Sequence, residues 1–514
     1  MGRRAFLGGA AAALSACASE PAAPDLGRIY ANVAQLKDEA RRPVITIPGT
    51  LGSRLRDRET DQLIWGGPNA LSLAPSSDAA IRAIALPIGA PETPLRQLRD
   101  TVRPDGVVRT AYASILGAVI QLDIYSGIIK TLIAGGYDFR ETREAEIAER
   151  DVNLDAFEFP YDWRRDIVEA AQDLAYFIDR KRAQVAEERR RVLGHSDAPI
   201  VFDLVAHSMG TLVARYYLMY GAQDLPADGS LPELTWEGAK NLGVVVFIAP
   251  PNFGSVLSVD NLVNGRSFGP FQPFYPAALL GTHVSTYQLF PRTRHGRVQS
   301  PAEPGPLDMF DVETWKRFRW GLVGTDPDAE RIRAVLLPDE QDPARRMALA
   351  EAHLAKTLRR AAQFQAAMDR ELIYPPEVDV YLVVGGGFQT PATTEIDPET
   401  GASTIVGFEE GDGIVLRASS LADERQGLGT REGARLVTPI RGERSTLLLP
   451  SEHVEITRSP VFGDNLLFWL LEDERAFATL RAPRAPGVPG PIRRAARGVA
   501  ATVMEGMGDL ARER

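Results

Sequence analysis

The chain has 514 residues, of which 44% are hydrophobic and 25% charged, and its formal net charge is -10. This composition is that of a globular protein with a sizeable core. The acidic balance gives no support to a nucleic-acid partner, because a basic surface is the expected signature of one. The length allows about three domains or one elaborated α/β domain.

The first 25 residues, MGRRAFLGGAAAALSACASEPAAPD, have a basic start, an apolar run and small residues before Cys17, the only cysteine of the chain. This is the order of an export signal, and the apolar run is shorter than the roughly 20 residues that span a bilayer. LSAC resembles the acylation site of bacterial lipoproteins. RRAFLG resembles a twin-arginine export signal, although an ordinary basic n-region carries the same arginines.

A lipid attached to Cys17 is therefore expected. Residues 1–17 are then a signal peptide, and residues 18–42 are a linker and an N-terminal helix. The mature protein is expected to be exported and lipid-anchored in the bacterial cell envelope, on the periplasmic side of the inner or outer membrane or at the cell surface. This anchor is the predicted contact with the membrane surface.

Apolar, β-branched runs alternate with helical stretches between residues 43 and 475. The runs lie at 43–47, 201–205, 242–251 and 378–387, and turns or loops bound them. Short continuous runs of this kind, alternating with helices, predict a mostly parallel sheet that helices cover on both faces. The predicted fold class is therefore α/β.

Two segments interrupt the alternation, at about 56–110 and 252–374. Both are irregular, with scattered Gly and Pro, and we predict that they are cap insertions, the second with one helix near 344–373.

Residues 112–139 are predicted to be helical and to end at a glycine pair, and TTEIDPETGASTIVGF is predicted to be a β-hairpin. The Pro/Arg-rich tail, 476–514, ends in a stretch that is either a packed or frayed helix or a membrane-surface contact.

The stretch VFDLVAHSMGTLVARYY, residues 201–217, runs from a strand-like part through Ser208 into a helix-like part. A sharp strand-to-helix turn lifts a serine out of the sheet and points the helix N-terminus at the negative charge that develops in ester cleavage. The first glycine of the usual Gly-x-Ser-x-Gly pattern is here Ala206, whose methyl group strains the turn without forbidding it. Ser208 is the predicted nucleophile, whereas Ser196, in GHSDA, is predicted to lie in a connecting loop.

A serine nucleophile needs a base and an acid, which follow it in the order acid then histidine in this kind of fold. His453, in LLLPSEHVEI, comes directly after the last predicted strand, where the base is expected. Asp412, in EEGDGIVL, lies on a glycine-flanked loop and is predicted to orient the imidazole and stabilise its cation. Structural roles are predicted for the other candidates: His207, His283, His295, His353, Asp397, Glu409 and Glu410.

An oxyanion hole needs two backbone N–H groups near the nucleophile. One is predicted to belong to Met209, directly after Ser208, and the other to Thr50, in the IPGT loop after the first core strand. A plain tight turn at Pro48-Gly49 is the alternative interpretation of that loop.

Five stretches together resemble one family: PVITIPGTLGSRL, FPYDWRRD, VAHSMGTLVARYY, GDGIV and SEHVEI. Their order and context are similar to those of the lecithin:cholesterol acyltransferase family, which includes phospholipid:diacylglycerol acyltransferases and lysosomal phospholipases. The resemblance implies an α/β-hydrolase fold with a cap and a triad of Ser208, Asp412 and His453. Ala206 and the absence of disulfides depart from the pattern, and the resemblance does not extend to cholesterol as acceptor.

The resulting expectation is a serine-dependent lipid acyl hydrolase or O-acyltransferase, which forms an acyl-enzyme on Ser208 and passes the acyl group to water or an alcohol. Its partner is a lipid or another acyl ester. Six Phe or Tyr residues in 268–290 line either an acyl groove or the cap core. The alternatives are an esterase for a polyester or cell-wall ester and a non-catalytic hydrolase-like binding protein of the envelope. No metal-binding motif occurs, so neither a metal nor another cofactor is expected.

Overall fold

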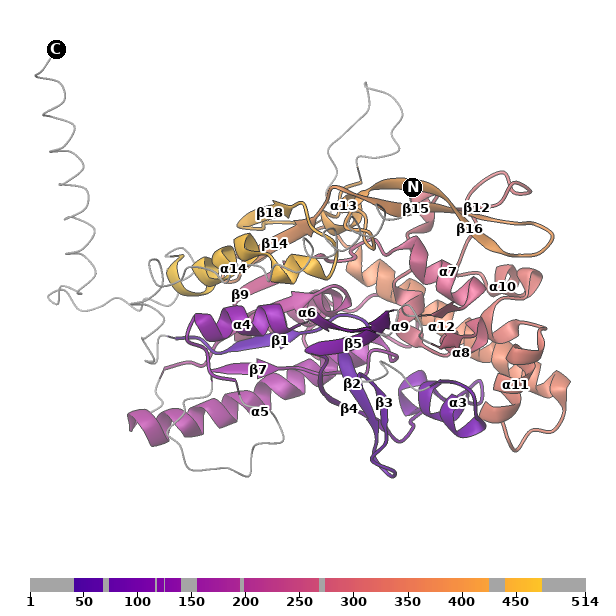
Figure 1. The fold of residues 1–514 in the computed structure, drawn as a ribbon, viewed down its shortest axis with the longest axis horizontal. Coiled ribbons are helices and arrows are strands. Elements are labelled where there is room, and N and C mark those ends of the chain that lie inside the picture. Colours follow the sequence, from indigo (N-terminus) through magenta and orange to yellow (C-terminus); the bar gives the residue numbers. More distant parts are fainter. Residues whose placement is uncertain are drawn as a thin grey trace, which may run out of the picture. The chain divides into compact units, whose positions relative to one another are not determined.

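The computed structural model describes residues 41–67, 74–115, 118–123, 125–139, 155–194, 198–267, 273–424 and 440–473 (Figure 1). Residues up to Glu472 belong to one compact unit, and Asp473 begins a second unit of which only that residue is described. The predicted signal peptide with Cys17, the N-terminal helix and the C-terminal tail lie outside the described residues. Among the residues described, no helix has the length and apolar character to cross a membrane.

A parallel sheet forms the centre of the first unit, with the strand order β18-β14-β9-β8-β1-β7. Its inner strands β1, β8, β9 and β14 are buried along their whole length, as parallel strands covered by helices are, whereas the edge strand β18 is largely exposed. All six carboxyl ends meet at one edge, which is where open α/β sheets place their ligands. The strands are β1 (Val44–Ile47), β7 (Ala156–Glu158), β8 (Phe202–His207), β9 (Leu242–Ile248), β14 (Asp379–Gly385) and β18 (Ser445–Leu449).

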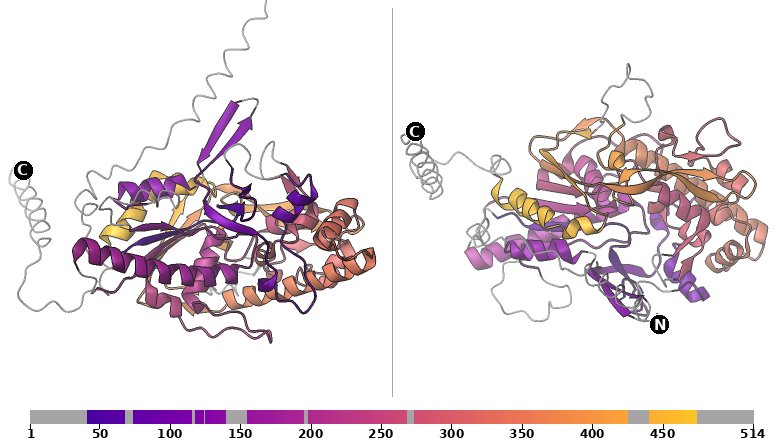
Figure 2. Two further views of the ribbon diagram at one scale, coloured as in Figure 1. Left: turned by 90° about the horizontal axis from the view of Figure 1, so that it is seen from below. Right: turned by 45° about the horizontal axis from the view of Figure 1, so that its top comes forward.

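Helices cover both faces of this sheet (Figures 1 and 2). On one face α5 (Ile167–Leu193) packs against α6 (Met209–Tyr220), and on the other α4 (Ser126–Ala134) packs against α14 (Pro460–Leu467), which continues into η7 (Phe468–Glu472). The boundaries of α5 follow from its caps: Asp166 accepts the Val168 N–H, and Gly194 ends the helix at a φ of 80°. The α/β-hydrolase fold expected from the sequence is thus confirmed.

The segment between β1 and β7 is mainly β-structure. An antiparallel sheet joins β2 (Ser53–Asp57), β3 (Leu63–Trp65) and β4 (Val102–Val107), and α3 (Asp78–Ile84) and η1 (Leu95–Gln97) lie between β3 and β4.

The predicted helix over 112–139 is wrong in its first half. That part forms a hairpin of β5 (Thr110–Ile115) and β6 (Ala118–Asp123), and only α4 is helical, capped by Gly135. Two six-residue runs separated by Leu116-Gly117 have hairpin spacing, and this turn signal outweighs the helix propensity of the alanines.

The segment between β9 and β14 is mostly helical and lies to one side of the sheet in Figure 1. Its long helix α12 (Pro343–Met368) matches the helix predicted near 344–373. The other elements are α7 (Val256–Asn264), β10 (Arg266–Ser267), β11 (Phe274–Tyr275), α8 (Ala277–Leu280), α9 (Val284–Gln288), η4 (Thr293–His295), β12 (Val298–Gln299), α10 (Val312–Phe318), η5 (Gly321–Val323), α11 (Pro327–Leu336) and β13 (Leu372–Ile373).

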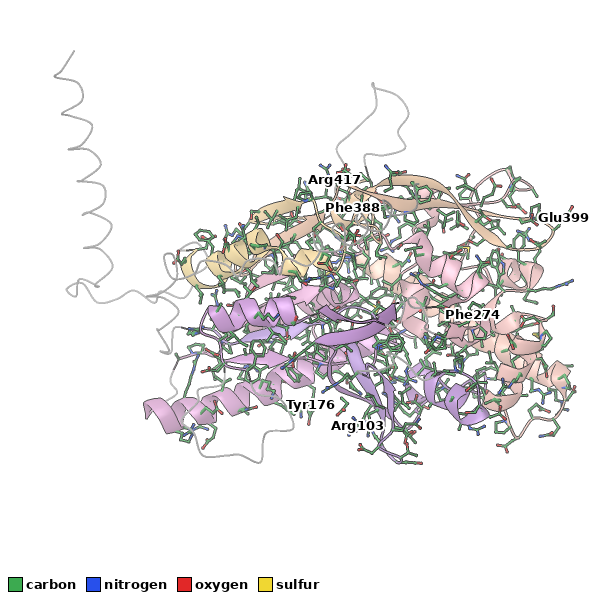
Figure 3. The ribbon with its side chains drawn as sticks, viewed as in Figure 1. Arg103, Tyr176, Phe274, Phe388, Glu399 and Arg417 are labelled. Carbon is green, nitrogen blue, oxygen red and sulfur yellow. The ribbon has the colours of Figure 1, made fainter. Side chains whose placement is uncertain are left out.

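A long antiparallel ribbon follows β14. Its strands β15 (Phe388–Ile396) and β16 (Ser403–Gly411) form the predicted hairpin, and the Asp397 carboxylate accepts the N–H groups of Glu399 and Thr400 in the turn. Figure 3 labels Phe388 and Glu399 at the two ends of β15 and its turn. The remaining elements are η3 (Glu237–Asn241), α13 (Arg417–Ser420), β17 (Ile440–Arg441) and η6 (Glu455–Arg458).

Candidate active site

Ser208 lies in the sharp turn between β8 and α6. Its φ of 53° and ψ of -129° are an uncommon backbone conformation for a residue with a side chain. The Ser208 N–H donates to the Ile248 carbonyl at 2.9 Å, and its own carbonyl accepts the Thr211 N–H at 2.9 Å. Strain of this kind persists only where the surroundings fix the backbone, as they do here. The turn has the form of a nucleophile elbow.

The two small positions of the elbow motif differ in their need for glycine. A Cβ on Gly210 would collide with the backbone carbonyls of Pro48 and Ile47. Ala206, by contrast, is a fully buried strand residue that pairs with Ile47 and Phe247, and its methyl group is part of the apolar core. The methyl group at 206 is accommodated, whereas the glycine at 210 is required.

His453 connects Ser208 to Asp412. Its Nε2 lies 2.9 Å from Ser208 Oγ, and its Nδ1 lies 2.7 Å from Asp412 Oδ2. The His453 N–H also donates to the Asp412 carbonyl at 2.9 Å, so backbone as well as side chain joins the two loops. The structure therefore brings together the three residues that the sequence singled out as nucleophile, base and acid.

Asp412 is buried but held as an anion. Burial raises the pKa of this carboxyl group, but the neighbouring His453 and the backbone N–H groups of Val415 and Ile414 outweigh it and leave the pKa below its ordinary value. Those N–H groups donate to Oδ1 at 2.7 and 3.0 Å, which leaves Oδ2 for the imidazole. The loop itself is anchored because Gly411 pairs with Phe388 and bridges to Leu416, next to Arg417 in Figure 3.

The loop after β1 lies against the nucleophile. A Cβ on Gly49 would lie 2.6 Å from the Cβ of Ser208, so only glycine allows this approach. Thr50 Oγ1 donates to the Met209 sulfur at 3.3 Å. Within the described part of the chain, the N–H groups of Thr50 and Met209 donate no hydrogen bond. Both are therefore free to receive an oxyanion.

Aromatic residues from distant parts of the chain fix this loop. Tyr161 donates from its hydroxyl group to the Pro48 carbonyl at 3.0 Å, and Trp65 donates from Nε1 to the Leu51 carbonyl at 2.7 Å. The Gly49 N–H donates to the Tyr125 hydroxyl at 2.7 Å. Sequence reasoning did not find these supporting residues. Their only signal was that Tyr161 belongs to the PYDWR stretch, whose role the sequence left undefined.

The same stretch attaches the first insertion to the core. Arg164 is 1% exposed, and its guanidinium pairs with Asp162 and Asp100 at 2.7 Å each. It also donates to the carbonyls of Ala83 and Ile84 at the end of α3. A buried guanidinium with this many acceptors is fully compensated, so PYDWR acts as a structural junction.

No hydrogen bond joins His283, His295 or His353 to Ser208 within the described part of the chain. His283 Nε2 contacts the Ile84 carbonyl at 3.1 Å, and His295 contacts Glu424 at 3.0 Å. His353 is buried in α12. Ser196 lies outside the described residues. Among the residues that are described, no cluster of three His, Cys, Asp or Glu side chains could hold a metal ion.

The fold and the elbow define an α/β hydrolase, and comparison with known proteins identifies its family. The sequence profile of the lecithin:cholesterol acyltransferase family matches residues 120–413, more than half of the chain, and the protein belongs to this family. The matched region contains Ser208 and Asp412, and His453 lies beyond it.

No curated protein matches the sequence. Among solved structures, the chain is similar to one described as "The crystal structure of Tle4-Tli4 complex", at 15% identity and a TM-score of 0.49, over 85% of this chain and 100% of that one.

Proposed function

We propose that the protein is a serine-dependent lipid acyl hydrolase or O-acyltransferase. The observation that carries the proposal is the continuous contact from Ser208 Oγ through the His453 ring to the Asp412 carboxylate. Membership of the acyltransferase family supports the same reaction class. A nucleophile and base within hydrogen-bond reach, with the base oriented by a third group, is the arrangement that acyl transfer requires.

In the first half-reaction, Ser208 Oγ attacks the ester carbonyl carbon while His453 Nε2 takes the hydroxyl proton. Asp412 stabilises the imidazolium that forms. The negative charge on the carbonyl oxygen is accepted by the N–H groups of Thr50 and Met209, which point from a fixed loop and a helix N-terminus. The tetrahedral intermediate then collapses, the alcohol leaves with the proton from His453, and the acyl group remains on Ser208.

In the second half-reaction, water or an alcohol enters. His453 takes its proton, its oxygen attacks the acyl carbon, and the second tetrahedral intermediate releases Ser208, whose oxygen regains the proton. A fatty acid results from water and a new ester from an alcohol. The chemistry on the enzyme is the same in both cases, so the choice of acceptor depends on how far water is excluded.

The lipid anchor expected at Cys17 supports a substrate in a membrane. An acylated N-terminus would keep the active site close to phospholipid. Replacement of Cys17 by Ser is expected to move the protein from the membrane fraction to the soluble fraction. Recovery of both forms in the same fraction would contradict the anchor.

The test of the reaction is labelling with a fluorophosphonate that reacts with activated serines. The unmodified protein should be labelled and Ser208→Ala should not, with a fall in esterase activity of more than about 10⁴-fold. Ser230→Ala, at an exposed loop serine, is the matched control. An unmodified protein that resists labelling would exclude a catalytic serine and leave the binding-protein alternative.

The acyl donor and acceptor are tested with vesicles of acyl-labelled phospholipid, with and without a long-chain alcohol. New labelled ester that depends on both the alcohol and Ser208 supports a transferase, and labelled fatty acid in both mixtures supports a hydrolase. Turnover of a short polyester but not of phospholipid would overturn the lipid substrate.

A further inference from the structure

Beneath the triad lies a chain of polar groups that the proposed reaction does not use. The Tyr125 hydroxyl lies 2.7 Å from the Gly49 nitrogen and 3.1 Å from His207 Nδ1. On its other side, His207 Nε2 lies 2.9 Å from the His453 carbonyl oxygen. Tyr125 and His207 are buried, so water cannot replace these contacts. This series of hydrogen bonds runs under Ser208. It begins at Gly49 in the loop after β1, here called the oxyanion loop because it contains Thr50, and ends at the backbone carbonyl of His453.

The direction of each hydrogen bond follows from its two ends. The His453 carbonyl can only accept, so His207 must carry a proton on Nε2. A neutral ring then has a bare Nδ1, to which the Tyr125 hydroxyl donates. The hydroxyl oxygen in turn accepts the Gly49 N–H. Every donor and acceptor is satisfied in this one arrangement, and loss of any member leaves a buried polar group unpaired.

His207 is held in its neutral form. Burial, and after it the adjacent His453 ring, lower its pKa to about 3 and outweigh the hydrogen bond to the His453 carbonyl, which raises it. The two rings lie 4.9 Å apart. A charge on His207 would oppose the imidazolium that forms on His453 during acyl transfer, and the neutral ring removes this opposition.

We propose that Tyr125 and His207 are positioning residues that fix the oxyanion loop and the His453 backbone as one unit. The proposal rests on the function proposed above. Gly49 precedes Thr50, so the acceptor that holds the Gly49 amide also sets the direction of the next peptide, whose N–H receives the oxyanion. At the other end, the His453 carbonyl is fixed directly next to the ring that takes the proton.

Tyr125→Phe removes the hydroxyl group and keeps the ring. The Gly49 amide and His207 Nδ1 then lose their partner, and the oxyanion loop relaxes. Loss of one oxyanion donor costs about 10²–10³ in kcat, and a displaced donor is expected to cost about 10–100-fold. KM should change less than twofold, because the interaction acts in the transition state.

The matched control is Tyr220→Phe. Tyr220 is also fully buried and donates from its hydroxyl group to a backbone carbonyl, that of Ala367, at 2.8 Å. It lies at the far end of α6. Both substitutions should lower the unfolding temperature by similar amounts, and only Tyr125→Phe should lower kcat and the rate of fluorophosphonate labelling.

A second variant tests the hydrogen bonds made by His207. His207→Phe removes both hydrogen bonds of the ring, and its fall in kcat should resemble that of Tyr125→Phe. The double variant should lose no more than the worse single variant, because groups that act as a unit are not additive. If the unmodified protein is labelled and Tyr125→Phe keeps the kcat of Tyr220→Phe, or if the two losses multiply, the positioning role is overturned while the proposed function stands. An unmodified protein without serine reactivity overturns both.

Discussion

Two buried histidines, His207 at the sheet edge and His353 in α12, differ in the partners of their ring nitrogens. His207, below the nucleophile, has a partner on each ring nitrogen. For His353, in α12, neither ring nitrogen has a hydrogen-bond partner among the described residues. Burial lowers the pKa of both, to about 3 for His207 and about 4 for His353.

The difference shows what each buried ring contributes. At the sheet edge, the buried polar groups of Tyr125, His207, His453 and Asp412 form one connected network, which can hold groups to within tenths of an ångström. In α12 the His353 ring is buried with neither nitrogen hydrogen-bonded among the described residues, and such burial costs stability. Substitutions at the sheet edge should therefore change activity, and those at His353 should change stability.

The largest effect is expected for Asp412→Asn. The amide group would favour the tautomer of His453 with the proton on Nε2, which cannot accept the Ser208 proton, so kcat should fall by about 10⁴-fold with the fold intact. Asp397→Asn, in an exposed hairpin turn, is the control and should keep full activity. Equal kcat values for the two variants would contradict the role of Asp412.

A smaller effect is expected for Tyr161→Phe. The Pro48 carbonyl loses its donor, but the bonds to Tyr125 and Trp65 still hold the loop, so we expect kcat to fall by about tenfold with little change in KM. Tyr216→Phe, which removes a hydroxyl bonded to the Gln223 carbonyl, serves as comparison. Steady-state kinetics of both variants decide whether the loop depends on this single donor.

The smallest effect is expected for His353→Leu, and it concerns pH. A folded pKa of about 4 lies below the ordinary value of 6.5, so between these values the unfolded chain binds the proton and the folded chain does not. The free energy of unfolding is therefore unaffected by the titration of His353 above pH 6.5. It falls as the pH decreases below that value, by roughly 2 kcal/mol at pH 5. The leucine variant should remove that loss.

Urea unfolding at pH 5 and pH 8 measures this effect. The stabilisation of His353→Leu over the unmodified protein should be greater at pH 5 than at pH 8. The same difference at both pH values would show that His353 does not set this part of the acid sensitivity.

The fold and the three residues that meet at the candidate site could be predicted because their signals are local. Ser208 and His453 lie in the loops after β8 and β18, two strands of the parallel sheet, whose carboxyl ends meet at one edge. Asp412 follows β16 of the antiparallel ribbon, and its signal was the glycine-flanked loop. The supporting residues could not be predicted in this way. Tyr125 is 76 residues from Gly49, and Tyr161 is 113 residues from Pro48. No periodicity or spacing in one sequence connects such pairs.

The hairpin of β5 and β6 was missed for a different reason. Its two runs, TAYASI and AVIQLD, are short and contain alanines, so their few polar residues do not separate a strand from a helix. The glycine between the two runs was the available signal. The cap role predicted for 56–110 and 252–374 stays a prediction, as does the lipid anchor at Cys17.

The position of β1 has a consequence for synthesis. Val44 in β1 pairs with Ala156 on one side and Asp203 on the other, so this first strand has no sheet partner until more than 100 further residues exist. A ribosome that adds about 5–20 residues per second needs roughly 8–30 seconds to go from the end of β1 to the end of β8. Both edges of this apolar strand lack their partners until β7 is made, and the edge that pairs with β8 lacks its partner for the whole of that time. We therefore expect β1 to be a segment of the nascent chain that chaperones protect.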